Sequence, residues 1–148
     1  MKELYCPQEN DFDEITALWE ASVRATHTFL SEEDISFFKP LIRNEYLQQV
    51  NLICTKDKSG NISGFMGISG QHLEMLFINP AARGAGIGKA LVLHAIQNLG
   101  VRFVDVNEQN EQAVGFYYHM GFELVSRDEL DGTGKPFPIL HLAIRKES

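Results

Sequence analysis

The sequence predicts an α/β fold in which a mixed, mostly antiparallel central sheet of six to seven strands is flanked by about four helices. In the middle of the chain, apolar strand-like segments at 73–78 and 101–106 alternate with helical segments at 86–99 and 110–120. Pairs of strand-like segments joined by turn-forming residues stand on both sides of this alternation. Because the chain has 148 residues, of which 44% are apolar, we expect one domain spanning residues 1–148.

The N-terminal third is predicted to be mainly helical. A short strand is expected at residues 4–6, and it ends at Pro7. Apolar side chains then recur at helical spacing between residues 11 and 25. Ser31 is followed by three acidic residues, which is typical of a helix N-cap, and the helical pattern resumes after Pro40.

Two hairpins complete the predicted sheet. The first pairs residues 51–55 with 62–68 around a turn at 58–61, whose sequence is Lys-Ser-Gly-Asn. The second joins strands at 122–126 and 139–144 through the turn-rich segment 131–136. Since no linker, repeat or low-complexity run interrupts the chain, all of these elements are expected in one continuous fold.

The most informative segment is residues 76–90, LFINPAARGAGIGKA, in which an apolar strand runs through a turn into a glycine-rich helix start. Gly84, Gly86 and Gly88 allow a tight turn and a close approach of the backbone to a ligand. The first N–H groups of the following helix are free to donate, and the helix dipole is positive at this end. The segment therefore predicts an anion site, suited to a pyrophosphate.

Two well-known phosphate motifs do not fit this segment. A dinucleotide fingerprint starting at Gly84 needs glycine where Lys89 stands. The Walker pattern needs glycine at Arg83 and a hydroxyl at Ala90. The pattern that remains is Arg-x-x-Gly-x-Gly, ending at Gly88, and an ordinary strand-to-helix turn stays open as the alternative.

This pattern, directly after an apolar strand and the turn at residues 79–80, resembles motif A of the GNAT superfamily, the acetyl-CoA-dependent N-acetyltransferases. A second segment, residues 110–122, is similar to the family's later Asn-x-x-Ala-x-x-x-Tyr-x-x-x-Gly-Phe pattern. The resemblance extends over nearly the whole chain and implies the GNAT fold. Segments 25–31, 106–117 and 134–142 look most similar to the bacterial YjaB-type acetyltransferases.

The resemblance implies acetyl-CoA as the acyl-donor cosubstrate. The strand backbone at residues 76–78 would pair with the pantetheine arm, and the N–H groups between Arg83 and Lys89 would hold the pyrophosphate. Asn110 matches the motif asparagine that lies along the CoA arm, and Phe116 would pack on it. The cofactor-binding residues implied in this way are Leu76, Phe77, Ile78, Arg83, Gly84, Ala85, Gly86, Ile87, Gly88, Lys89, Asn110 and Phe116.

Direct transfer of an acetyl group to an amine needs a proton donor for the leaving thiolate. Tyr117 matches the position of the family's usual general acid. The alternative is a core aromatic beside Phe116 and Tyr118. Because one helix cannot bury three successive aromatic side chains on one face, at least one of the three must point elsewhere.

The amine must also lose a proton, and Glu74 is the candidate base because it lies in an otherwise apolar strand. By strict alternation it shares a face with His72, Leu76 and Ile78, where partial desolvation would make it a stronger base. The alternatives are a solvated carboxylate at the start of a strand, or His72 or a water molecule as the base.

Candidate contacts to the acceptor are His27, Phe29 and His72, with residues 135–137 as a further wall. For the loops at 25–29 and 135–137, a hydrophobic lid that closes the core stays open as the alternative. A net charge of −7 disfavours a nucleic-acid partner and permits a cationic amine. The histidines lack metal-ligand spacing, so no metal is expected. No apolar run is long enough for a membrane span, and the first residues do not resemble a signal peptide, so a cytoplasmic location is expected.

The sequence therefore predicts an acetyl-CoA-dependent N-acetyltransferase acting on a primary amine of a small molecule, peptide or protein. A non-catalytic acyl-CoA-binding sensor or interaction module is the alternative, since its phosphate loop would look the same. An acid at Tyr117 opposite a base at Glu74 favours the enzyme, because a pure binding module needs neither. Either a monomer or a homodimer is compatible with the sequence.

Overall fold

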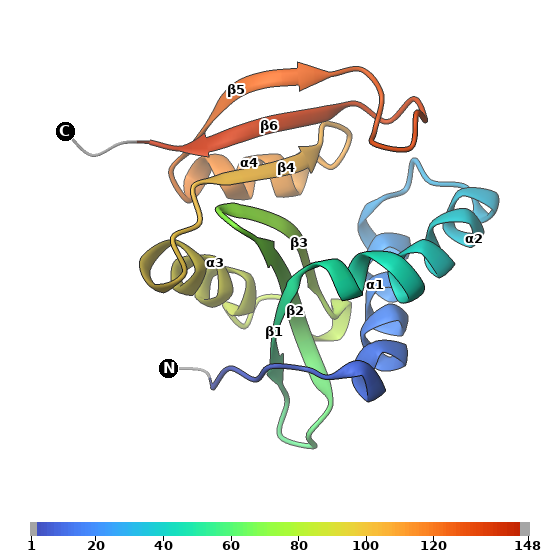
Figure 1. Ribbon diagram of the computed structural model, residues 1–148, viewed down its shortest axis with the longest axis vertical. Helices are drawn as coiled ribbons and strands as arrows, with labels where there is room; N and C mark the ends of the chain where they lie inside the picture. The colour runs from blue at the N-terminus through green and yellow to red at the C-terminus, as the bar shows by residue number, and fades with distance from the viewer. Residues whose placement is uncertain (1–2, 146–148) are drawn as a thin grey trace.

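Six strands form one mixed sheet in the order β1-β2-β3-β4-β6-β5 in the computed structural model, which describes residues 3–145 (Figure 1). Neighbouring strands are antiparallel except β3 and β4, which are parallel. The fold class predicted from the sequence is confirmed. The strands are β1 Asn51–Lys56, β2 Ile62–Ser69, β3 His72–Ile78, β4 Phe103–Asn107, β5 Phe122–Asp128 and β6 Ile139–Ile144, and the main helices are α1 Phe12–Thr26, α2 Glu32–Leu41, α3 Ile87–Asn98 and α4 Glu111–His119.

The N-terminal prediction is correct for the helices and wrong for the strand. Ser31 is the N-cap of α2: its Oγ accepts a hydrogen bond from the Asp34 N–H at 3.1 Å, and the Asp34 carboxylate accepts one from the Ser31 N–H at 3.0 Å. This reciprocal pair satisfies two donors that a helix start leaves free. In place of a strand at residues 4–6 there is a single bridge between Tyr5 and Cys54.

Helices α1 and α3 pack on opposite faces of the β1–β3 part of the sheet (Figure 1). In β2, Met66 packs with α3 whereas its neighbour Phe65 packs with α1, as strand alternation requires. Gly64 permits a close approach here, because a Cβ at that residue would lie 2.8 Å from the Ile87 side chain. The start of α3 is therefore fixed against the buried middle strand.

Strands β3 and β4 diverge almost as soon as they meet. Their pairing is limited to His72 with Phe103 and Leu73 with Val104. Beyond Leu73, β3 stays paired with β2 along one edge. Within residues 3–145, no strand pairs with the other edge of this part of β3. Helix α4 packs on β4 and β5, on the far side of this divergence. The sheet is consequently open between the C-terminal ends of β3 and β4.

A β-bulge lies at the point of divergence. Leu73 pairs with Ile68 and Met75 pairs with Gly67, so Glu74 between them has no partner in β2. An extra residue of this kind bends the strand and shifts its alternation by one. The expectation that Glu74 shares a face with Leu76 is therefore wrong: Leu73 and Leu76 pack in the same cluster with α3.

Candidate active site

Two cavities meet at the opening between β3 and β4, and their linings carry opposite charge. The first, of about 370 Å³, is lined by Glu74, Asp105 and Asp131 and, among residues 3–145, by no lysine or arginine; we call it the acidic cavity. The second, of about 400 Å³, is lined by Arg83 and Lys89 and by no aspartate or glutamate; we call it the basic cavity. Both have the size of small-molecule sites, and they suit ligands of opposite charge.

The two cavities share one wall, so ligands bound in them would meet. Residues from α1, β3 and α4 and their flanks line both cavities: His27, Leu76, Phe77, Asn110, Ala113 and Tyr117. At this wall β3 presents the backbone edge that lacks a partner strand. An extended ligand with amide groups can bind such an edge as an added strand.

The loop between β3 and α3 is built by its sequence. The Asn79 side chain accepts a hydrogen bond from the Ala81 N–H at 3.0 Å, and the Asn79 N–H donates to the Ser63 carbonyl at 2.9 Å. Gly84 and Gly86 then have φ values of +82° and +75°, in the left-handed region that favours glycine. Gly86 is the N-cap of α3.

The loop presents a set of free N–H donors. Ala90 is the first residue of α3 whose N–H reaches back to a carbonyl, that of Gly86, at 3.0 Å. Within the described residues, no N–H between residues 84 and 89 donates to a protein acceptor. The first turn of α3 carries no acidic residue, and Arg83 and Lys89 are exposed without an ion pair among residues 3–145. This arrangement suits a bound pyrophosphate.

Tyr117 lies at the junction of the two cavities. Its ring is buried and packs edge-on against Phe116 and Phe122, with centroids 5.3 and 5.7 Å away. Burial raises the pKa of the phenol, so the group is fully protonated at neutral pH. The neighbouring Tyr118 is exposed, which confirms that the three successive aromatics do not share one buried face.

Glu74 lines the acidic cavity but is exposed, which contradicts the expected desolvation. The reason is the bulge, which takes the residue out of the regular alternation at the edge of the opening. Within residues 3–145 its carboxylate makes no hydrogen bond or ion pair. Glu74 is thus placed to contact a ligand or water in that cavity.

His27 is buried at the shared wall and is neutral at pH 7. Burial, and next the charge of Arg83, lower the pKa of its imidazole to about 4. The Thr26 hydroxyl donates to the Ser22 carbonyl and lies 2.7 Å from His27 Nδ1, so we assign the proton to Nδ1. Phe29, in the acidic cavity, packs on the His27 ring at 5.3 Å.

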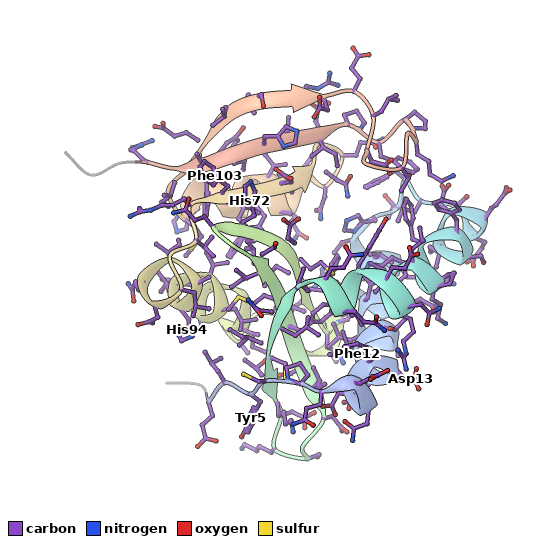
Figure 2. All side chains as sticks on the ribbon, in the orientation of Figure 1. Tyr5, Phe12, Asp13, His72, His94 and Phe103 are labelled. Carbon is purple, nitrogen blue, oxygen red and sulfur yellow. The ribbon has the colours of Figure 1, made fainter. Side chains whose placement is uncertain are left out.

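His72 does not belong to either cavity, contrary to expectation. It stands where β3 and β4 are still paired, and its exposed ring stacks on Phe103 with centroids 4.9 Å apart (Figure 2). The sequence places it near Glu74 along the strand. The two residues nevertheless differ in place, because β3 lines the cavities from Leu73 onward and His72 lies outside both.

Asn110 lies at the shared wall and also caps a helix. It is the N-cap of α4, and its Oδ1 accepts a hydrogen bond from the Ala113 N–H at 3.3 Å. Phe116 lines the basic cavity near Gly88, where a Cβ would lie 3.6 Å from the ring. Of the implied cofactor residues, only Ala85 does not line the basic cavity; the others are Leu76, Phe77, Ile78, Arg83, Gly84, Gly86, Ile87, Gly88, Lys89, Asn110 and Phe116.

Sequence reasoning missed Asp105 and Asp131, two of the three acids of the acidic cavity. Asp105 stands between buried valines in β4, and Asp131 begins a tight turn in which its carboxylate accepts three hydrogen bonds. An acid between apolar strand residues signals only the exposed face of a strand. The register that brings Asp105 to the opening involves a distant strand.

Among residues 3–145 there is no group of three or more histidine, cysteine or acidic side chains placed to hold a metal ion. None of the helices in the described part of the chain is both long and apolar enough to span a membrane.

A helix start with free N–H donors beside an unpaired strand edge, with a phenol at the junction of two cavities, fits an acyl-CoA-dependent transferase. The chain belongs to the GNAT acetyltransferase family: residues 26–137 match the model of the acetyltransferase (GNAT) domain. It is an acetyl-CoA-dependent N-acetyltransferase, as the sequence predicted.

The relatives support this assignment over most of the chain. The peptidyl-lysine N-acetyltransferase YjaB of Escherichia coli (strain K12) is 45% identical over 131 residues, covering 88% of each chain. The peptidyl-lysine N-acetyltransferase YiaC of the same strain is 31% identical over 131 residues, covering 87% of this chain and 88% of YiaC. The solution structure of apo YjaB from E. coli matches with a TM-score of 0.89 at 40% identity, covering 99% of both chains.

Proposed function

We propose that this enzyme acetylates the side-chain amine of lysine in peptides or proteins. The observation that carries the proposal is the pair of oppositely charged cavities with a shared wall. The basic cavity suits an anionic cosubstrate, and the acidic cavity suits a lysine ammonium group. The peptidyl-lysine relatives, which align with 87 to 88% of this chain, support the same acceptor.

In this proposal the basic cavity holds acetyl-CoA. The free N–H groups of residues 84–89 and the side chains of Arg83 and Lys89 bind the pyrophosphate. The unpaired edge of β3 at residues 76–78 binds the pantetheine amides, and Phe116 packs beside them. Acetyl-CoA supplies the activated acetyl group at the shared wall.

Two side chains act as general base and general acid in the transfer. Glu74 accepts a proton from the lysine ammonium, directly or through a water molecule, so that the amine can attack the thioester carbonyl. As the new N–C bond forms and the C–S bond breaks, Tyr117 donates its proton to the leaving thiolate. The attacking nitrogen loses its second proton to the Tyr117 phenolate, directly or through water, and Glu74 gives up its proton to solvent, so the net reaction releases one proton.

The first experiment measures release of free CoA thiol by the purified protein with lysine peptides, polyamines, amino acids and aminoglycosides. We expect turnover with lysine peptides, and mass spectrometry of the product should locate the acetyl group on the lysine side chain. A no-amine control measures hydrolysis. Turnover with only a small-molecule amine, or with none of the panel, would contradict the peptide assignment.

The role of Tyr117 has its own test. Tyr117→Phe should lower kcat about 100-fold, as expected for loss of a general acid, and leave the Kd of acetyl-CoA nearly unchanged. Tyr118→Phe is the matched control, because Tyr118 is exposed on the same helix. Equal kcat values for the two variants would assign the proton donation to water.

We also propose a domain organisation, a location and an assembly for this protein. A single catalytic domain over residues 1–148 is supported by the family match to residues 26–137. A cytoplasmic location is supported by the proposed use of acetyl-CoA and protein lysines. A monomer or homodimer is our prediction for the assembly, which light scattering of the purified protein would test.

A further inference from the structure

Three ionisable side chains are linked by hydrogen bonds across the C-terminal half of the sheet. His141 in β6 lies with its Nδ1 2.6 Å from Asp105 Oδ1 in β4 and its Nε2 2.6 Å from Asp128 Oδ2 in β5. The register explains the contacts, because Asp105 pairs directly with His141 and Asp128 lies opposite Ile139, two residues away. All three therefore share one face of the sheet.

That face is turned away from the core and toward the acidic cavity. Val104 and Val106, the neighbours of Asp105, are buried in the cluster that contains Tyr117. By alternation, Asp105 points to the other side of β4. Residues of both faces of β4 line the acidic cavity at the opening of the sheet, and Asp105 is part of its wall. His141 and Asp128 do not line that cavity. They line a neighbouring groove, which Asp105 also lines.

The hydrogen bonds fix the protonation of this group. Ionised carboxylate oxygens only accept hydrogen bonds, so both nitrogens of His141 must donate and the ring is an imidazolium. The hydrogen bonds to Asp128 and then Asp105 raise the pKa of the His141 imidazole. One positive charge between two carboxylates leaves one negative charge in excess at the edge of the acidic cavity.

Asp105 also keeps an unused acceptor. Its Oδ1 is bonded to His141, and its Oδ2 accepts from no group within residues 3–145. Two nearby acids, Glu108 in the turn after β4 and Glu123 in β5, differ from it. Glu108 pairs with Arg127 and Glu123 pairs with Arg145, so each shares its charge with one cation, and neither lines the acidic cavity.

We propose that His141 is a positioning residue of the acceptor site, which holds the Asp105 carboxylate at the wall of the acidic cavity to receive the acceptor's ammonium group. The inference rests on the proposed function and adds an acceptor contact to it. Asp128 anchors the imidazolium from the opposite side. Asp105 binds the lysine side chain before Glu74 removes its proton.

The test compares a lysine peptide with the same peptide carrying norleucine, which has a similar aliphatic chain without the charge. Calorimetry measures the Kd of both peptides on the full chain saturated with CoA, so that no reaction occurs. Wild type should bind the lysine peptide about 10-fold or more tightly, as for one charge-assisted hydrogen bond. A change that acted only through the fold would weaken both peptides alike.

Variants then separate the roles of Asp105 and His141. Asp105→Asn should reduce the preference for lysine to about twofold or less, because it removes the charge and keeps the shape. His141→Leu should reduce the preference partly, because it leaves the Asp105 carboxylate in place but unanchored. Glu123→Gln is the matched control, since it removes an acid from β5 outside the acidic cavity, and the preference should persist.

A titration of His141 by NMR gives a second readout. The groups facing its ring are Asp105 and Asp128. Glu129 and Asp131 line the same groove as these three side chains. The pKa of His141 should fall in Asp105→Asn, because the neutral amide stabilises the imidazolium less.

Three results would overturn the inference: a wild-type protein without preference for lysine, an Asp105→Asn variant that keeps the preference, or a His141→Leu variant with the full wild-type preference. Acetylation of the lysine peptide by wild type, measured separately, tests the proposed function. Turnover with an unchanged preference in Asp105→Asn would reject only the role of Asp105.

Discussion

Gly86→Ala, compared with a control variant at another glycine of positive φ, should separate the cost of backbone strain from the loss of CoA affinity. Gly86 has φ of +75°, and a Cβ there would meet no atom within 4 Å, so the substitution creates no clash in the free protein. A non-glycine residue in this region costs about 1–2 kcal/mol, which lowers Tm by roughly 3–6 °C in a chain of this size. The new methyl group would stand at the wall of the basic cavity, where the pyrophosphate is proposed to bind.

Displacing the pyrophosphate should break at least two charge-assisted hydrogen bonds, a loss of about 3 kcal/mol, on the order of 100-fold in the Kd of CoA. Gly60→Ala is the matched control: Gly60 has φ of +85° and equally open surroundings, and lies in the β1–β2 turn outside both cavities. Calorimetry with CoA and thermal unfolding of both variants provide the data. If the two variants lose stability alike and bind CoA equally well, the phosphate site is not at Gly86.

Three other predictions test the electrostatics of the site. The neutral state of His27 stabilises the fold fully above the ordinary histidine pKa, and this contribution of about 3 kcal/mol is lost as pH falls from about 6.5 to 4. Urea unfolding should therefore show the stability difference between wild type and His27→Gln shrinking over that window; a constant difference would mean that His27 titrates normally. Glu74→Gln should lower kcat/KM for the acceptor about 100-fold and remove the acidic limb of the pH–rate profile, and a retained limb would assign the base elsewhere. Arg83→Gln and Lys89→Gln should each weaken CoA binding about fivefold at low salt and less at high salt, whereas salt-independent losses would exclude direct charge attraction.

The sequence located most of the elements because their ends carry local signals. Ser31 and Asn110 cap their helices by side-chain hydrogen bonds, and Gly86 precedes α3 with the positive φ that its residue type permits. These signals act within three residues of the helix start, so they can be recognised without knowledge of the fold. The loop of the basic cavity was predictable for the same reason.

The acidic cavity was less predictable, because its members depend on strand register. The bulge at Glu74 exists only relative to β2, and strict alternation misplaced this residue. His72 was expected beside Glu74 in the site, yet it stands where the strands are still paired. Asp105 became a candidate only when pairing with β6 and the divergence from β3 were known.

The brief pairing of β3 with β4 has a consequence for the lifetime of the enzyme in a cell. Within residues 3–145, the ladder between the β1–β3 part of the sheet and the β4–β6 part has only two residue pairs, and one apolar cluster packs across both parts. A ligand in the basic cavity would contact β3 and α4 together and so connect the two parts. At a concentration 100 times its Kd, such a ligand adds about 2.7 kcal/mol to the stability. Resistance to proteolysis, and with it the lifetime of the enzyme, should therefore rise with the concentration of acyl-CoA.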